Sequence, residues 1–144
     1  MDHLVDLDVL ASRLRPVVSE WRSRSGIDVG PLTWRDELAS WPQPILTDRS
    51  SIEVPESVGL RVRRGQVDEL EVCVWTGGWA DVGYVRDDQV VDRSPHFQDV
   101  DGALAVVVEN VEDFLARDHA GVSREPGPRN WWIRLTKRSE RRSG

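Results

Sequence analysis

Residues 67–86 read VDELEVCVWTGGWADVGYVR, with apolar and polar residues alternating in both halves. A period of two residues is typical of a strand that buries one face. The diglycine Gly77-Gly78 between the halves favours a tight turn. The stretch therefore predicts an antiparallel hairpin whose core-facing residues are Leu70, Val72, Val74, Ala80, Val82 and Tyr84.

Further strands are predicted on both sides of this hairpin. Val58, Leu60 and Val62 alternate with polar residues and glycine before the turn at Gly65-Gln66. After the hairpin, Asp87-Asp88 predicts another turn into a strand over residues 89–92. Because the connections are short, these strands should form an antiparallel meander. With short candidates at residues 52–54 and 130–136, we expect about five strands, most of them within residues 52–93.

Two long helices flank the strands. Residues 3–25 carry apolar side chains at helical spacing, although Pro16 requires either a kink or two short helices that meet there. Residues 99–117 carry a broad apolar stripe behind Asp99, a suitable N-cap. The valines in this second segment leave a strand over residues 103–108 as the alternative.

The region between the first helix and the strands is irregular in sequence. Thr33 is placed to cap a short helix over residues 34–41, which Pro42 and Pro44 would end. The chain of 144 residues fits one domain. We predict an α+β fold in which an antiparallel meander is covered on one face by the two main helices. A basic tail follows at residues 137–144.

Composition limits the compartment and the kind of partner. A single cysteine, Cys73, excludes an internal disulfide and a multi-thiolate zinc site. The N-terminus lacks a signal-peptide pattern, and no apolar run approaches the length of about 18 residues that spans a membrane. We therefore expect a cytoplasmic protein that does not interact with membranes.

Charge is unevenly distributed along the chain. The formal net charge of the chain is −6. Residues 129–144 hold six basic residues and one acid, a net charge of +5, so residues 1–128 carry −11. Such a body repels nucleic acid and anionic membranes and attracts a basic partner, although it also simply favours solubility. The basic tail beside Trp131-Trp132 is compatible with nucleic-acid stacking, but the charge of the body argues against that function.

No catalytic or cofactor-binding motif is recognisable. There is no G-x-S-x-G elbow and no phosphate-binding glycine motif. His96 is the best general-base candidate, but no second histidine or cysteine lies at metal-ligand spacing from it. Cys73 lies in mid-strand and is typical of a small buried filler. We expect no enzyme activity, no cofactor and no metal. Paired carboxylates would need a defined cleft, which the sequence does not indicate.

Tryptophan is unusually frequent, with seven residues among a total aromatic content of only 7%. Trp75 and Trp79 flank the diglycine turn. Most tryptophans fill a core, but the residue is also enriched where proteins bind one another. With seven present, we expect at least one to serve an interface.

The segment ELEVCVWTGGWADVGYV, followed by DDQVV and by a helix that ends VEDFLA, resembles small actinobacterial immunity proteins of polymorphic toxin systems. The TriTu-type immunity family is the most similar, and the leading helix with Glu20-Trp21 also matches it. The resemblance covers about half of the chain. This chain departs from the pattern at Gly78 and Trp79 and in its extension after the second helix.

The resemblance implies a binding protein that caps the active site of a cognate toxin. Acidic residues would face the toxin's basic surface. Residues implied as partner contacts are Glu69, Glu71, Trp75, Trp79, Asp81, Asp87 and Asp88. A secretion chaperone or adaptor is the alternative, and an enzyme or small-ligand carrier is the third possibility. The sequence is compatible with a monomer or a homodimer.

Overall fold

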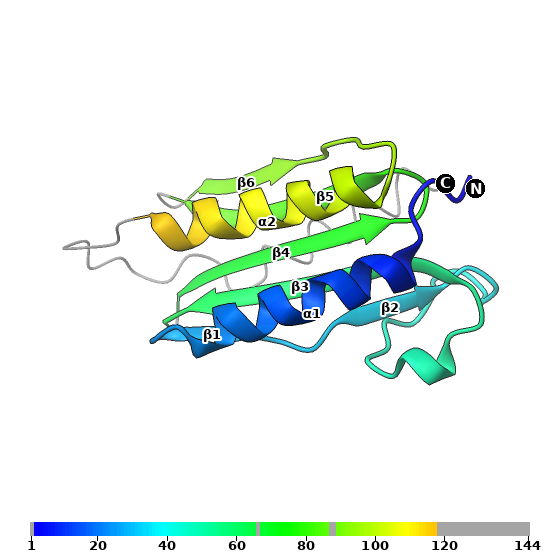
Figure 1. Cartoon of the computed structure of the whole chain (residues 1–144), viewed down its shortest axis with the longest axis horizontal. Coiled ribbons are helices and arrows are strands. Elements are labelled where there is room, and N and C mark those ends of the chain that lie inside the picture. Colours follow the sequence, from blue (N-terminus) through cyan, green and yellow to red (C-terminus); the bar gives the residue numbers. More distant parts are fainter. Residues whose placement is uncertain (1, 66, 87–88, 118–144) are drawn as a thin grey trace.

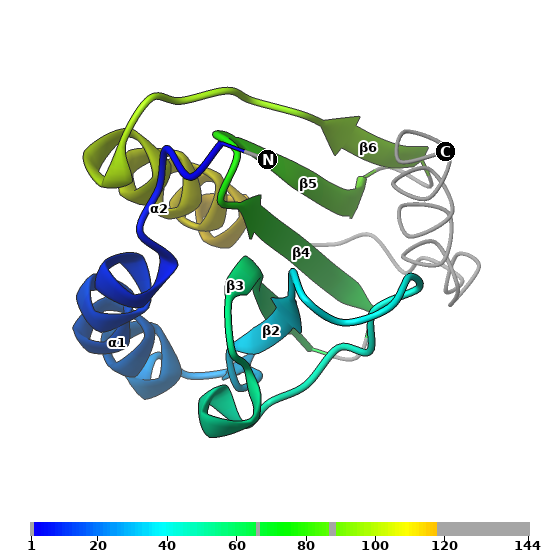
Figure 2. The same cartoon turned by 90° about the vertical axis from the view of Figure 1, so that its right-hand side faces the viewer.

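The computed structural model describes residues 2–65, 67–86 and 89–117. In these ranges one antiparallel sheet carries two helices on the same face, as Figures 1 and 2 show from two sides. The predicted α+β class and the position of both helices are thus confirmed. None of the helices in this part of the chain combines the length and apolar character needed to cross a bilayer.

The sheet has six strands in the order β1-β3-β4-β5-β6, with β2 also paired to β3. The meander predicted for the centre of the chain runs from β3 to β6. The elements are α1 (Leu7–Ser23), β1 (Ile27–Val29), β2 (Thr33–Asp36), the 3-10 turn η1 (Arg49–Ser51), β3 (Pro55–Arg64), β4 (Asp68–Trp75), β5 (Trp79–Arg86), β6 (Gln89–Arg93) and α2 (Val100–Ala116).

Both helices begin at an aspartate that caps them. The Asp6 carboxylate accepts hydrogen bonds from the backbone N–H groups of Asp8 and Val9 at 3.0 and 3.1 Å, so α1 begins later than the predicted residue 3. Asp99 caps α2 as predicted, accepting from Gly102 at 2.8 Å. Pro16 lies inside one continuous α1, so the two-helix alternative is wrong.

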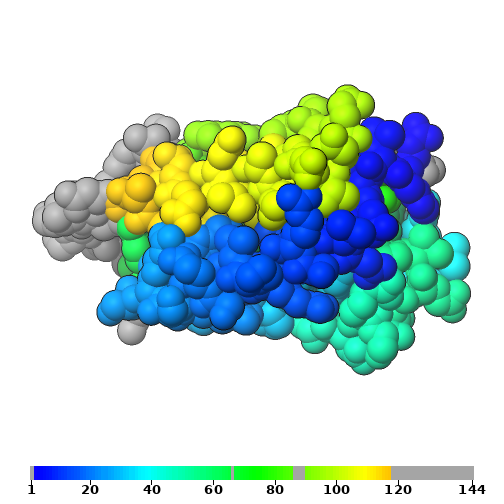
Figure 3. All heavy atoms as spheres, viewed as in Figure 1, coloured from blue at the N-terminus to red at the C-terminus, as the bar shows by residue number. Residues whose placement is uncertain are grey.

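The core lies between the helices and the sheet. The predicted inward residues of the hairpin are all buried there, with Val58, Leu60 and Val62 of β3 beside them. Figure 3 shows α1 and α2 side by side over this face. Trp21 of α1 is fully buried, and its indole N–H donates to the Glu112 carboxylate of α2 at 2.7 Å. Apolar burial and this bond hold the helices together.

The helix predicted over residues 34–41 is wrong, because this region begins with β2. Trp34 pairs with Val58 of β3 and forms a bridge with Leu46 on its other side. These long-range pairings outweigh the local capping pattern of Thr33. The strand predicted at residues 52–54 is also wrong, since η1 precedes it and the strand begins at Pro55.

β1 and β2 together form one interrupted edge of the sheet. Val29 pairs with Val62 and Thr33 pairs with Gly59. The chain therefore advances four residues along the edge while it advances three along β3. The extra residue lies next to Pro31, which has no N–H to donate. The predicted strand at residues 130–136, the tail at 137–144, Trp131-Trp132 and Asp87-Asp88 lie outside the described residues.

Candidate functional site

Five of the seven predicted contact residues share the sheet face opposite the helices. Strand alternation places Glu69, Glu71 and Trp75 of β4 on this face, and the register brings Trp79 and Asp81 of β5 beside them. We call this surface the open face of the sheet. Asp87 and Asp88 belong to the part of the chain that the structure does not describe.

Side chains on the open face lie in rows that run across the strands. The first row runs from the end of β2 to the start of β5 and has a large side chain at each of its two ends. The second row is made of small or short side chains. The rows are Arg35-Ser57-Trp75-Trp79, then Thr33-Gly59-Cys73-Asp81, then Arg61-Glu71-Gly83.

The acidic residues of the open face are balanced by arginines that β3 contributes. The Glu69 carboxylate lies 3.0 Å from the Arg61 guanidinium and 3.3 Å from that of Arg63. Arg61 also lies 3.7 Å from Glu71. Glu69 is only 9% exposed, so its carboxylate is used within the sheet and little of it can reach a partner.

The two tryptophans of the hairpin stack on each other. Their ring centroids are 5.9 Å apart with an interplanar angle of 16°. Trp75 is buried, and its indole N–H donates to the Asp81 carboxylate at 3.1 Å. Trp79 is half-buried. Of this pair, Trp79 therefore offers more surface to a partner.

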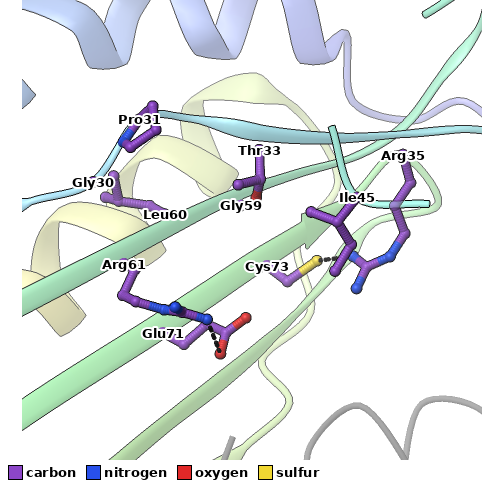
Figure 4. Close-up of a pocket in the computed structure, with 10 residues that line it drawn as sticks. All are labelled: Gly30, Pro31, Thr33, Arg35, Ile45, Gly59, Leu60, Arg61, Glu71 and Cys73. Carbon is purple, nitrogen blue, oxygen red and sulfur yellow. Dashed lines mark hydrogen bonds and ion pairs between the residues drawn. The ribbon is translucent and has the colours of Figure 1, made fainter. Parts of the chain in front are cut away.

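A pocket of about 350 Å³ opens on this face (Figure 4). Thr33, Gly59 and Cys73 of the second row form its floor, with Arg35 on one side and Arg61 and Glu71 on the other. No sequence motif predicted it. The lining residues are Gly30, Pro31, Thr33, Arg35, Ile45, Gly59, Leu60, Arg61, Glu71 and Cys73.

Small residues and the broken edge explain why the pocket exists. A Cβ at position 59 would overlap the Thr33 hydroxyl oxygen, so only glycine leaves this arrangement undisturbed. Pro31 and Gly30 lie at the interruption of the edge and form part of the rim. A glycine inside a strand is the one sequence signal that indicates such a close approach.

Arg35 is the central polar side chain of the pocket. Its Nη1 donates to the Ser57 hydroxyl and to the Cys73 sulfur, each at 3.1 Å. Its guanidinium carbon lies 5.0 Å from the centre of the Trp75 ring, a cation–π distance. The first row of the open face thus holds the guanidinium in place.

Burial raises the pKa of both ionisable groups beside Arg35. It raises the pKa of the Glu71 carboxyl, and the opposing effects of Arg61 and Arg35 are smaller. It also raises the pKa of the Cys73 thiol. A thiol held protonated is a poor nucleophile, and an arginine cannot act as its general base. Cys73 is therefore poorly suited to act as a nucleophile in this pocket.

A second feature borders the pocket. The loop over residues 37–45 exposes three large apolar side chains: Leu38 is 64% exposed, and Trp41 and Ile45 are each 49% exposed. We call residues 37–45 the apolar loop. Three large exposed apolar side chains in one loop are more than the single exposed ones that most surfaces carry, and they indicate an interaction site.

Hydrogen bonds fix both ends of the apolar loop. Trp34 and Leu46 exchange two N–H···O bonds of 2.7 and 2.9 Å at its far end. At its near end the Asp36 carboxylate accepts from the N–H groups of Leu38, Glu53 and Val54 at 3.0, 2.8 and 3.2 Å. The loop also contains a cis peptide bond before Pro42. It is therefore held in place at both ends.

The remaining candidates do not form a site. His96 is exposed and lies in a backbone bridge opposite Trp79. Among the described residues, no three histidine, cysteine or acidic side chains are grouped to hold a metal ion. Comparisons with protein-family models, curated proteins and solved structures found no match.

Proposed function

We propose that this chain is an immunity protein, a non-catalytic inhibitor that binds a cognate toxin domain and occludes its active site. The apolar loop carries the proposal. An anchored backbone presents Leu38, Trp41 and Ile45 at the surface of the described residues, where a bound partner would bury them. Full burial of each such side chain contributes about 1.5–3 kcal/mol.

Charge supports a basic partner. The −11 carried by residues 1–128 would speed the approach of a basic toxin surface. On the open face we assign partner contacts to Trp79 and Asp81, which are half-buried. Glu69, Glu71 and Trp75 are held by other side chains of the sheet, and we propose a supporting role for them.

The test takes as candidate toxins the protein domains that neighbouring genes encode and measures their binding to this chain. Trp41→Ala should weaken that binding by about thirtyfold or more, because an exposed tryptophan on an anchored loop is a typical dominant contact. Its free energy of unfolding should stay unchanged. Val67→Ala is the matched control, since Val67 is 45% exposed but lies outside the apolar loop.

Two results would separate the alternatives. If folded Trp41→Ala protein binds the toxin as tightly as the parent chain, the apolar loop is not the interface. If the parent chain binds but leaves the toxin active, the protein is a secretion chaperone or adaptor instead. Growth of a host that expresses the toxin measures this difference directly.

A further inference from the structure

The pocket on the open face contains a positive charge that the sheet does not neutralise. Arg61 and Arg63 each pair with a carboxylate of β4. Arg35 instead contacts a hydroxyl, a thiol and an aromatic ring. No carboxylate in the described residues lies within ion-pair distance of Arg35, although Glu56 and Glu71 lie near enough to feel its field.

The guanidinium of Arg35 has donors left over. It carries five N–H groups in a planar fork, and both contacts to protein side chains use Nη1. The Thr33 hydroxyl lies over Gly59 at the floor of the same pocket. Its side chain makes no hydrogen bond to any described residue. An anion in the pocket would therefore meet a charged fork and a neutral donor together.

The other walls of the pocket are apolar. Pro31 and Ile45 line the mouth, and Ile45 is half exposed because nothing in the described chain covers it fully. Sites for small ligands commonly combine such walls with a few fixed polar groups, and they begin at volumes of about 300 Å³. The pocket reaches this size.

We propose that this pocket binds a small organic monocarboxylate. The carboxylate lies on the fork of Arg35 with the Thr33 hydroxyl beside it, and its apolar body lies against Ile45 and Pro31. A single guanidinium matches the two oxygens of a carboxylate in a bidentate pair. Inorganic phosphate is disfavoured because it has no apolar body to lie against Ile45 and Pro31. The pocket shares Ile45 with the apolar loop, but its test uses the chain without a toxin.

The test titrates the whole chain with benzoate and follows the indole and backbone N–H resonances by NMR. We expect saturable binding at one site, with the largest shifts around Thr33, Arg35 and Gly59. Benzamidine, which has the same shape and the opposite charge, and inorganic phosphate should produce no saturable shift there.

Variants assign the binding to Arg35. Arg35→Gln should weaken benzoate binding at least about tenfold, as expected for the loss of a charged hydrogen-bond pair. Arg63→Gln, an exposed arginine on the same face, should leave it unchanged. If Arg35→Gln does not fold, Ile45→Asp takes its place, since Ile45 is exposed and a carboxylate at the mouth should repel benzoate.

Three outcomes would overturn the proposal. These are no saturation by benzoate, equal binding of benzamidine, or unchanged binding by a folded Arg35→Gln or Ile45→Asp variant. All of them use the isolated chain, so none bears on whether Trp41 binds a toxin. Loss of toxin binding in Trp41→Ala, in turn, says nothing about the pocket.

Discussion

Neighbouring residues of β4 face opposite surroundings on the two sides of the sheet. Leu70 lies under the helices in the hydrophobic core, whereas Glu69 lies on the open face between two arginines. The helix-covered face gains its free energy from burial, which needs no particular direction. The open face depends on directed contacts among charged, sulfur and aromatic groups. The difference suggests that the first face stabilises the fold and the second carries recognition.

The largest expected effect is on the helix-covered face. Leu70→Ala should lower the free energy of unfolding by about 2–5 kcal/mol, because a fully buried leucine leaves a cavity. Cys73→Ala, on the open face of the same strand, should cost less than half as much. Urea unfolding followed by circular dichroism measures both. Equal losses would contradict the division of roles between the faces.

A smaller effect is expected at the floor of the pocket. Gly59→Ala should cost about 1–3 kcal/mol, because the new methyl group overlaps the Thr33 hydroxyl. Adding Thr33→Ala should recover most of this loss, and a double-mutant cycle measures the coupling. Additive losses would show that the strain arises elsewhere.

The buried carboxyl of the open face should make stability depend on pH. The pKa of Glu71 is raised in the folded chain above its ordinary value of 4.5, chiefly by burial. Its contribution is therefore complete below that value and is lost as pH rises through the folded pKa. As pH rises through the folded pKa of Glu71, the free energy of unfolding of the parent chain should therefore fall relative to that of Glu71→Gln. Unfolding curves at several pH values measure the difference, and parallel profiles would contradict it.

The carboxylate between the helices should show the opposite and smallest effect. The pKa of Glu112 is lowered, first by its hydrogen bond from Arg24 and then by the bond from Trp21. Its contribution is present above the ordinary value of 4.5 and is lost as pH falls through the folded pKa. Glu112→Gln keeps an acceptor for Trp21 and removes the charge. Unfolding at about pH 7 and about pH 3.5 should differ less in the variant than in the parent. If the difference between the two pH values is the same in variant and parent, the ion pair with Arg24 does not cause the pH dependence.

Local signals were sufficient for the central elements. The alternation in residues 67–86 depends only on which side chains face the core, and Asp99 caps its helix through atoms three residues away. β2 was missed because Trp34 is held by Val58 and Leu46, which are distant in sequence. A capping residue at Thr33 cannot reveal those partners.

The open face was predicted in position but not in charge. Alternation placed Glu69 and Glu71 correctly on the side away from the helices. Their pairing with Arg61 and Arg63 depends on the register between β3 and β4, which a strand pattern alone does not give. Gly59 is the one residue whose type indicates the pocket. Glycine weakens a strand, so its presence inside one indicates that another group approaches the backbone closely.

The interrupted edge formed by β1 and β2 also limits how other chains can attach to this sheet. An uninterrupted edge presents a row of unpaired backbone groups that templates aggregation or strand exchange. Here an extra residue between Val29 and Thr33 shifts the ladder after the three residues of β1, and Leu46 already occupies the outer side of β2 at Trp34. A strand from another chain would find no long run of regularly spaced, unpaired backbone groups at this edge. The interruption therefore disfavours templated association there.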